Sequence, residues 1–133
     1  MSEVILDASA LLAVLRKEPG REIVEPLLVG AAVSAVNYSE VIKKSVEAGG
    51  KANEARAVLR LMDLLVVPFD EPQAVEAGAL FGRTRVKGLS FADRACLALG
   101  LIRQWPVITT EQKFAEVGLP LEVRVIRKAA RKH

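Results

Sequence analysis

The chain has 133 residues, 51% of them hydrophobic, which suffices for one domain with a buried core and leaves no room for a second. Its formal charge of +3 depends on a basic tail from about residue 127, which is either a solvated terminus or a tether for a polyanion. No apolar run is long enough to cross a bilayer and no signal-peptide pattern is present, so we expect a soluble, cytoplasmic protein with no membrane partner.

Short apolar runs alternate with helical patterns along the whole chain. Strands are expected at residues 4–6, 32–34, 64–67, 107–109 and 123–126. Helices are expected at residues 8–15, 21–29, 37–48, 51–62, 70–85 and 90–105, with a short one after 111. This alternation predicts the α/β class, with a three-layer α/β/α arrangement around a mainly parallel sheet of about five strands, as a single domain over residues 1–133.

Several common kinds of site have no support in the sequence. Neither a G-x-G-x-x-G loop nor a G-x-x-x-x-G-K-[ST] loop is present, which argues against a dinucleotide site and a P-loop. Cys96, the only cysteine, lies in an apolar helical segment, where a small buried side chain is favoured over a nucleophile or a ligand.

Pro26 is expected to disturb the second helix, because proline lacks the backbone N–H that a helix interior needs.

Four acidic residues lie at strand ends or near helix starts. Asp7 follows the first strand, Glu40 lies in the first turn after the second, Asp93 lies in the first turn of the most apolar helix, and Glu111 follows the fourth strand. The carboxyl ends of parallel strands meet at one edge of a sheet, where open α/β proteins place their ligands. These four side chains are therefore candidates for a single pocket.

Helix capping offers a second explanation for the same acids, because acidic residues favour the first turn of a helix through its dipole. Residues 37–40 and 90–93 both have the spacing of a capping box. Ser9 and Thr109 can act as local hydroxyl acceptors, and a threonine can cap the helix that contains Glu111. Capping alone does not require the acids to gather at one edge of the sheet.

Carboxylates that share a pocket repel one another, at a cost of roughly 1 kcal/mol per pair at about 4 Å in water and about 4 kcal/mol at an effective dielectric constant near 20. Such a cluster requires cations. Because its ligands are all oxygen, Mg²⁺ or Mn²⁺ is favoured over zinc. Hard cations at an open edge favour phosphate chemistry, since they polarise a phosphodiester and generate hydroxide from bound water. Lys87 and Arg94 lie beside Asp93 in sequence, as do Arg83 and Arg85, and these residues either contact a nucleic-acid backbone or are solvated.

At these residues the chain resembles PIN-domain ribonucleases, specifically the toxin subunit of VapBC-type (type II) toxin-antitoxin pairs. The match covers nearly the whole chain, and its motifs occur in order at specific spacing. They are VILDASAL at 4–11, NYSEV at 37–41, LSFAD at 89–93 followed by the Ala- and Leu-rich helix, and PVITTE at 106–111.

The resemblance implies a PIN-like fold and a metal-dependent endoribonuclease in which Asp7, Glu40 and Asp93 bind Mg²⁺ or Mn²⁺. Glu111 and Thr109 would then support the ion, the water or the phosphate. The family usually has Asp in a Thr-x-Asp pattern where this chain has Glu111, which puts direct metal contact by Glu111 in doubt. The resemblance also implies a homodimer, an RNA substrate, and inhibition by a small VapB-like antitoxin whose peptide occupies the active-site groove.

Two questions stay open at the level of sequence. The apolar segments at residues 10–15 and 23–28 either receive a partner helix or lie in the core. A haloacid-dehalogenase-like phosphatase also begins at a strand-end Asp, but it needs a second acid two residues later, where this chain has Ser9. The non-enzymatic alternative is a catalytically silent PIN-like module that keeps its carboxylates as helix caps and only binds RNA or a partner.

Overall fold

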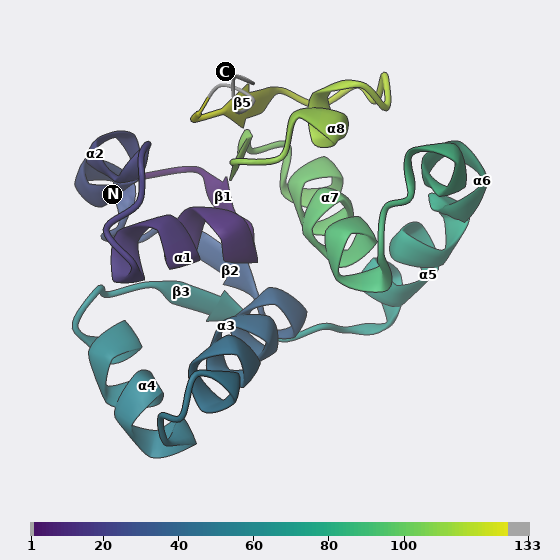
Figure 1. Cartoon of the computed structure of the whole chain (residues 1–133). Helices are drawn as coiled ribbons and strands as arrows, with labels where there is room; N and C mark the ends of the chain where they lie inside the picture. The colour runs from purple at the N-terminus through teal and green to yellow at the C-terminus, as the bar shows by residue number, and fades with distance from the viewer. Residues whose placement is uncertain (1, 128–133) are drawn as a thin grey trace.

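Five short strands form one parallel sheet in the computed structural model, which describes residues 2–127 (Figure 1). Most of the expected basic tail lies outside the described residues. The strands are β1 (Ile5–Leu6), β2 (Ala32–Ser34), β3 (Leu65–Val67), β4 (Val107–Thr109) and β5 (Val123–Val125). Their order across the sheet is β3-β2-β1-β4-β5, and each neighbouring pair is parallel. All five expected strands are confirmed, and β1 lies at the centre.

Successive strand residues point to opposite faces of the sheet, so each face packs under its own group of helices. Leu6 and Ile108 belong to one buried cluster, and Ile5 and Val107 belong to the other. The first cluster includes residues of α1 (Ala8–Leu15), α2 (Arg21–Val24), α3 (Ala35–Glu47) and α4 (Ala52–Arg60). The second includes residues of α5 (Glu71–Ala79), α7 (Phe91–Arg103) and α8 (Gln112–Ala115). Helices therefore cover both faces of the sheet, which confirms the three-layer α/β/α arrangement, and α3 of the first group also contacts α7 of the second.

Helix limits follow the expected order with two local differences. The helix expected at residues 21–29 is α2 followed by a 3-10 turn, η1 (Glu25–Leu27), because Pro26 cannot donate the bond that would continue an α-helix. The helix expected at residues 70–85 is divided into α5, α6 (Phe81–Thr84) and the 3-10 turn η2 (Arg85–Lys87). Within residues 2–127, none of the helices combines the length and apolar character needed to span a bilayer.

The apolar helix α1 is part of the core. Ala10, Leu11 and Ala13 are fully buried, and Leu12 packs against the same cluster. The sequence left open whether residues 10–15 receive a partner helix or lie in the core. The structure places them in the core. The segment after α1 is mixed, because Val24 is fully buried while the Ile23 side chain is exposed.

Candidate active site

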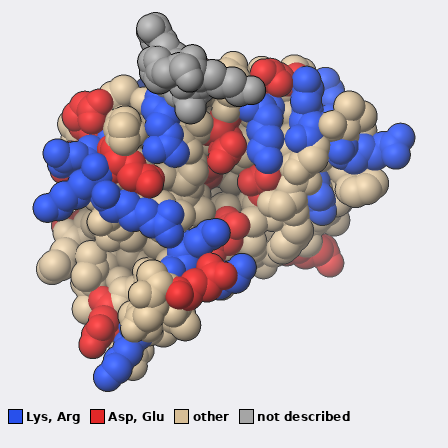
Figure 2. All heavy atoms as spheres, in the orientation of Figure 1, with Lys and Arg blue, Asp and Glu red and all other residues tan. Residues whose placement is uncertain are grey.

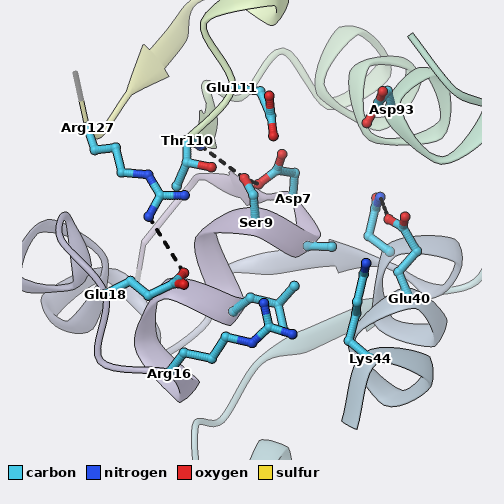
Figure 3. Close-up of a pocket in the computed structure, with 13 residues that line it drawn as sticks. Asp7, Ser9, Arg16, Glu18, Glu40, Lys44, Asp93, Thr110, Glu111 and Arg127 are labelled. Carbon is cyan, nitrogen blue, oxygen red and sulfur yellow. Dashed lines mark hydrogen bonds and ion pairs between the residues drawn. The ribbon is translucent and has the colours of Figure 1, made fainter. Parts of the chain in front are cut away.

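The four predicted acids line one cavity of about 290 Å³ at the carboxyl edge of the sheet (Figure 3). Asp7 comes from the end of β1, Glu40 from α3, Asp93 from α7 and Glu111 from the loop before α8. Figure 2 shows a hollow on this side of the molecule, with acidic atoms at its border and basic side chains beyond them. The structure thus places the predicted set in a single pocket.

Asp7 is the most buried of the four acids, with 4% of its surface exposed. It is the N-cap of α1, and its Oδ1 accepts hydrogen bonds from the Ala10 N–H at 2.9 Å and the Ser9 hydroxyl at 2.7 Å. Its Oδ2 accepts a bond from the Thr109 hydroxyl at 2.7 Å. Asp7 therefore caps α1 and also lines the pocket, and hydrogen bonds hold both of its carboxylate oxygens in place.

Burial raises the pKa of Asp7 from 3.8 to about 6, because a charged carboxylate loses hydration there. The three hydrogen bonds oppose this shift in pKa by stabilising the charged form, and the negative charge of Asp93 adds to it. A cation in the pocket would stabilise the charged form and lower the pKa of Asp7.

Glu40 reaches the pocket from the second turn of α3, not from the first turn as the sequence suggested. The helix begins at Ala35 because the Ser34 hydroxyl accepts a bond from the Val36 N–H and acts as the cap. The interpretation of residues 37–40 as a capping box is therefore wrong. Instead, the Asn37 amide donates to Glu40 Oε1 at 3.2 Å.

Asp93 lies in the first turn of α7, as expected. Its Oδ2 accepts a bond from the Ser90 N–H at 2.9 Å, while the Ser90 hydroxyl accepts one from the Asp93 N–H at 3.2 Å. This is the expected capping box. Lys113 lies 4.0 Å from the same carboxylate. The cap uses one oxygen of Asp93 and leaves its side chain at the border of the pocket.

Glu111 has the least constrained carboxylate of the four. Its side chain makes neither a hydrogen bond nor a salt bridge to the described residues and points toward Asp7 in Figure 3. Its backbone N–H donates to the Thr109 hydroxyl at 3.0 Å, and the Thr110 N–H donates to the Ser9 hydroxyl at 3.0 Å. Ser9 and Thr109 therefore join β1 to the loop after β4 and orient Asp7 from both sides.

Among the predicted site residues, Arg94 lies away from the pocket. Its Nε donates to the Ala77 carbonyl of α5 at 3.1 Å, and its guanidinium lies 5.4 Å from the centre of the Phe81 ring. Neighbouring helical residues point about 100° apart, so Arg94 cannot share the direction of Asp93. Its contacts join α7 to α5 and α6.

Basic residues complete the cavity, and only Arg127 among them was noted from the sequence, as the start of the basic tail. Arg16, Lys44 and Arg127 line it, and Arg127 lies 3.6 Å from Glu18. Two positional signals for them exist in the sequence. Lys44 follows Glu40 by four residues on one helix, and Arg16 ends the helix that starts beside Asp7.

The donor set of the cavity suits an oxygen-preferring divalent cation such as Mg²⁺ or Mn²⁺. The carboxylates supply charged oxygens, and the buried Asn37 Oδ1 has no hydrogen-bond partner among the described residues. Within residues 2–127, no three acidic, cysteine or histidine side chains are grouped closely enough to hold an ion as they stand. An ion held here would therefore keep water ligands between itself and some of the carboxylates.

Comparison with known proteins agrees with this geometry. The sequence matches the family model of the PIN domain over residues 4–119. The chain belongs to the PIN domain family. The family resemblance expected from the motifs is confirmed, and the matched range includes all four acids of the pocket. Among curated protein sequences, none matches this PIN domain.

Solved structures share the fold of this PIN domain at low sequence identity. A toxin-antitoxin complex from Klebsiella pneumoniae matches with a TM-score of 0.75 at 18% identity, covering 95% of this chain and 99% of that one. The sarcin-ricin loop cleaving toxin VapC20 of Mycobacterium tuberculosis has a TM-score of 0.73 at 18% identity, covering 91% and 98%. A DNA-bound VapBC from Salmonella typhimurium has a TM-score of 0.71 at 18% identity, covering 93% and 98%.

Proposed function

We propose that this PIN domain is a metal-dependent endoribonuclease that hydrolyses RNA phosphodiester bonds and serves as the toxin of a type II toxin-antitoxin pair. The observation that carries the proposal is the convergence of Asp7, Glu40, Asp93 and Glu111 on one cavity of a PIN domain. The fold shared with VapBC complexes and with an RNA-cleaving toxin supports the biological role.

Mg²⁺ or Mn²⁺ would be held by Asp7, Asp93 and Glu40, and when bound would polarise the phosphate and acidify water. Ser9 and Thr109 fix the direction of both Asp7 oxygens, so this carboxylate is oriented before any ligand arrives. Asn37 orients Glu40 in the same way.

Glu111 has a role different from that of the three ligands. Its carboxylate is exposed and has no hydrogen bond to the described residues, so it is free to accept a proton from the attacking water. Attack of that water on phosphorus with departure of the 3′ oxygen leaves a 5′-phosphate on one product. A supporting function of this kind does not require Glu111 to contact the metal, which fits the departure from the Thr-x-Asp pattern.

Cleavage of RNA by the purified chain tests this mechanism. Structured and single-stranded RNAs are incubated with Mg²⁺, Mn²⁺ or a chelator, and the product ends are mapped. Asp93→Asn should abolish cleavage, because one carboxylate charge is lost while the amide oxygen still caps α7. Glu54→Gln, a matched change on the surface of α4, should have no effect. Cleavage that persists in Asp93→Asn or in chelator would exclude the mechanism.

The second candidate is a silent binding module. It is favoured by the hydrogen bonds that give Asp7 and Asp93 structural roles and by the absence of a preassembled metal cluster within residues 2–127. Calorimetric titration with Mn²⁺ distinguishes the two. Uptake that disappears in both Asp7→Asn and Asp93→Asn supports the nuclease, and no uptake by the unmodified chain supports the module.

The proposed partners are a small VapB-like antitoxin and a second copy of the chain. Expression of the chain alone in a bacterial host should arrest growth, and Asp93→Asn should remove the arrest. Size-exclusion chromatography with light scattering should give the mass of a dimer. Growth arrest by the Asp93→Asn variant at equal expression would contradict a toxin that acts through this site.

A further inference from the structure

We propose that Lys44 and Arg16 form a phosphate subsite on the α1–α3 side of the cavity, which holds a backbone phosphate next to the scissile one. Asn37 is the positioning residue that keeps Lys44 available. The identification of the ligand as RNA rests on the proposed function. The subsite itself is argued from charges and contacts in the cavity.

The first observation is an ion pair that does not form. Glu40 and Lys44 lie four residues apart on α3, with the acid toward the N-terminus, which is the arrangement that most favours a salt bridge. Three residues further along the same helix, Lys43 and Glu47 do form a salt bridge at 3.9 Å, although the lysine comes first there, which is the less favoured order. Glu40 and Lys44 form none, although both line the cavity.

Asn37 explains the difference. Its side chain is 1% exposed, and its Nδ2 donates both to Glu40 Oε1 at 3.2 Å and to the Ala92 carbonyl at 3.0 Å. The second bond fixes the amide against the first turn of α7, so the Glu40 carboxylate is bonded to Asn37 rather than paired with Lys44, whose side chain projects beside it in Figure 3. The Lys44 ammonium therefore borders the cavity without an acidic partner among the described residues.

Arg16 provides the second charge. It is the C-cap of α1, where the helix dipole favours a cation, and its side chain lines the cavity without a salt bridge to any residue of 2–127. In Figure 3, Arg16 and Glu111 lie on opposite sides of Asp7, and Lys44 projects beside Glu40. Arg127 does not belong to the subsite, because Glu18 already pairs with it.

The cavity is therefore divided into an acidic part and a cationic part. A polyanion cannot approach four carboxylates without compensation, and one divalent cation would neutralise only two of their charges. The unpaired side chains of Lys44 and Arg16, beside the acids, would attract the phosphate next to the scissile one. Guanidinium and ammonium groups are the usual donors to phosphate oxygens.

RNA binding in the absence of divalent ions tests the subsite directly. Fluorescence anisotropy with a short labelled oligouridylate in chelator gives the affinity over a range of salt concentrations. Each phosphate contact with a single strand contributes about 0.7 to the slope of log K against log salt. Because both side chains would hold the same phosphate, Arg16→Gln with Lys44→Gln should reduce this slope by about 0.7. Lys51→Gln with Arg56→Gln, an equal change of charge outside the cavity, should leave it nearly unchanged.

A second measurement tests the role of Asn37. Asn37→Ala frees Glu40 to pair with Lys44, so the slope should fall by the same amount as in Lys44→Gln alone. Combining Asn37→Ala with Glu40→Gln removes the carboxylate that competes for Lys44. This double variant should have the same slope as Glu40→Gln alone. A purely structural function of Asn37 would not be rescued in this way. Asn37→Ser provides the same comparison if the alanine variant does not fold.

The outcomes separate this subsite from the nuclease activity. If the double variant of Arg16 and Lys44 (the cavity pair) and the double variant of Lys51 and Arg56 (the α4 pair) give equal salt slopes, the subsite is overturned. This holds even if the unmodified chain cleaves RNA. An unmodified chain that does not bind the oligonucleotide at the lowest salt concentration also overturns it. A reduced slope in the cavity pair supports the subsite even if no divalent ion activates cleavage.

Discussion

Folding and the proposed chemistry place competing demands on Asp7. Its Oδ1 caps α1 and its Oδ2 receives the Thr109 hydroxyl, but burial disfavours the charge that metal binding needs. A pKa of about 6 means that this carboxyl exchanges its proton close to neutral pH. The cost of ionising Asp7 should therefore appear in the stability of the metal-free protein.

Asp7→Asn should stabilise the metal-free protein near neutral pH. The folded state raises the pKa of Asp7 from 3.8 to about 6, so it binds the proton more tightly than the unfolded state. Stability from this residue is complete below about pH 4 and is lost as pH rises through 6. The free energy of unfolding in urea with chelator should increase by about 2–3 kcal/mol at pH 7.5 and by almost nothing at pH 4. An equal gain at both values would contradict the assignment.

Thr109→Val should destabilise the protein through the same network. Thr109 is fully buried, donates to Asp7 and accepts from the Glu111 N–H, so valine leaves two polar groups without a partner. We expect a loss of about 1–3 kcal/mol in the free energy of unfolding. Thr109→Ser retains the hydroxyl and should lose much less. A valine variant as stable as the serine variant would show that these bonds contribute nothing.

Sequence spacing could predict which acids meet but not what holds each one. Asp7 and Asp93 were recognisable because a strand end and a helix start fix their direction. The contact between Asn37 and Glu40 depends on where α3 begins, and Ser34 moved that start by two residues relative to expectation. Arg94 contacts α5 and α6 and does not line the pocket, because one position along a helix turns a side chain toward a different neighbour.

At the scale of elements, α7 packs closely against β4 and the loop before β5. A Cβ on Gly100 would lie 2.7 Å from Val107 Cγ2 and 3.2 Å from Leu121 Cδ1, so glycine lets α7 approach β4 and the loop before β5. Gly78 in α5 has no atom within 4 Å of the same position. Identical residues in neighbouring helices thus have different functions, which the sequence alone does not distinguish.

Gly100→Ala and Gly78→Ala should therefore change stability in opposite directions. Alanine at 78 gains helix propensity of about 0.5–1 kcal/mol without a steric contact. Alanine at 100 forces Val107 and Leu121 to move, and we expect a net loss of about 1–3 kcal/mol. Thermal unfolding of both variants measures the difference. A stabilised Gly100→Ala variant would mean that α7 can shift away from the sheet without cost.

At the scale of the whole molecule, strand order explains why the pocket forms at β1. The chain passes from β1 to β2 and β3 on one side, then returns to β4 and β5 on the other. Connections leave the sheet in opposite directions at this reversal and open a crevice between β1 and β4. Alternating elements predict a parallel sheet, but several strand orders satisfy that pattern, so the sequence could not determine which acid is central.

Mn²⁺ should stabilise the whole fold, because its proposed ligands come from β1, α3 and α7. A ligand that binds only the folded state at 100 times its dissociation constant contributes about 2.7 kcal/mol, which raises the melting temperature by roughly 10 °C for a chain of this size. The shift should shrink below about pH 6, where the proton competes for Asp7. Asp93→Asn should abolish it while Glu54→Gln retains it. A shift of equal size in Asp93→Asn would mean that Mn²⁺ binds elsewhere on the molecule.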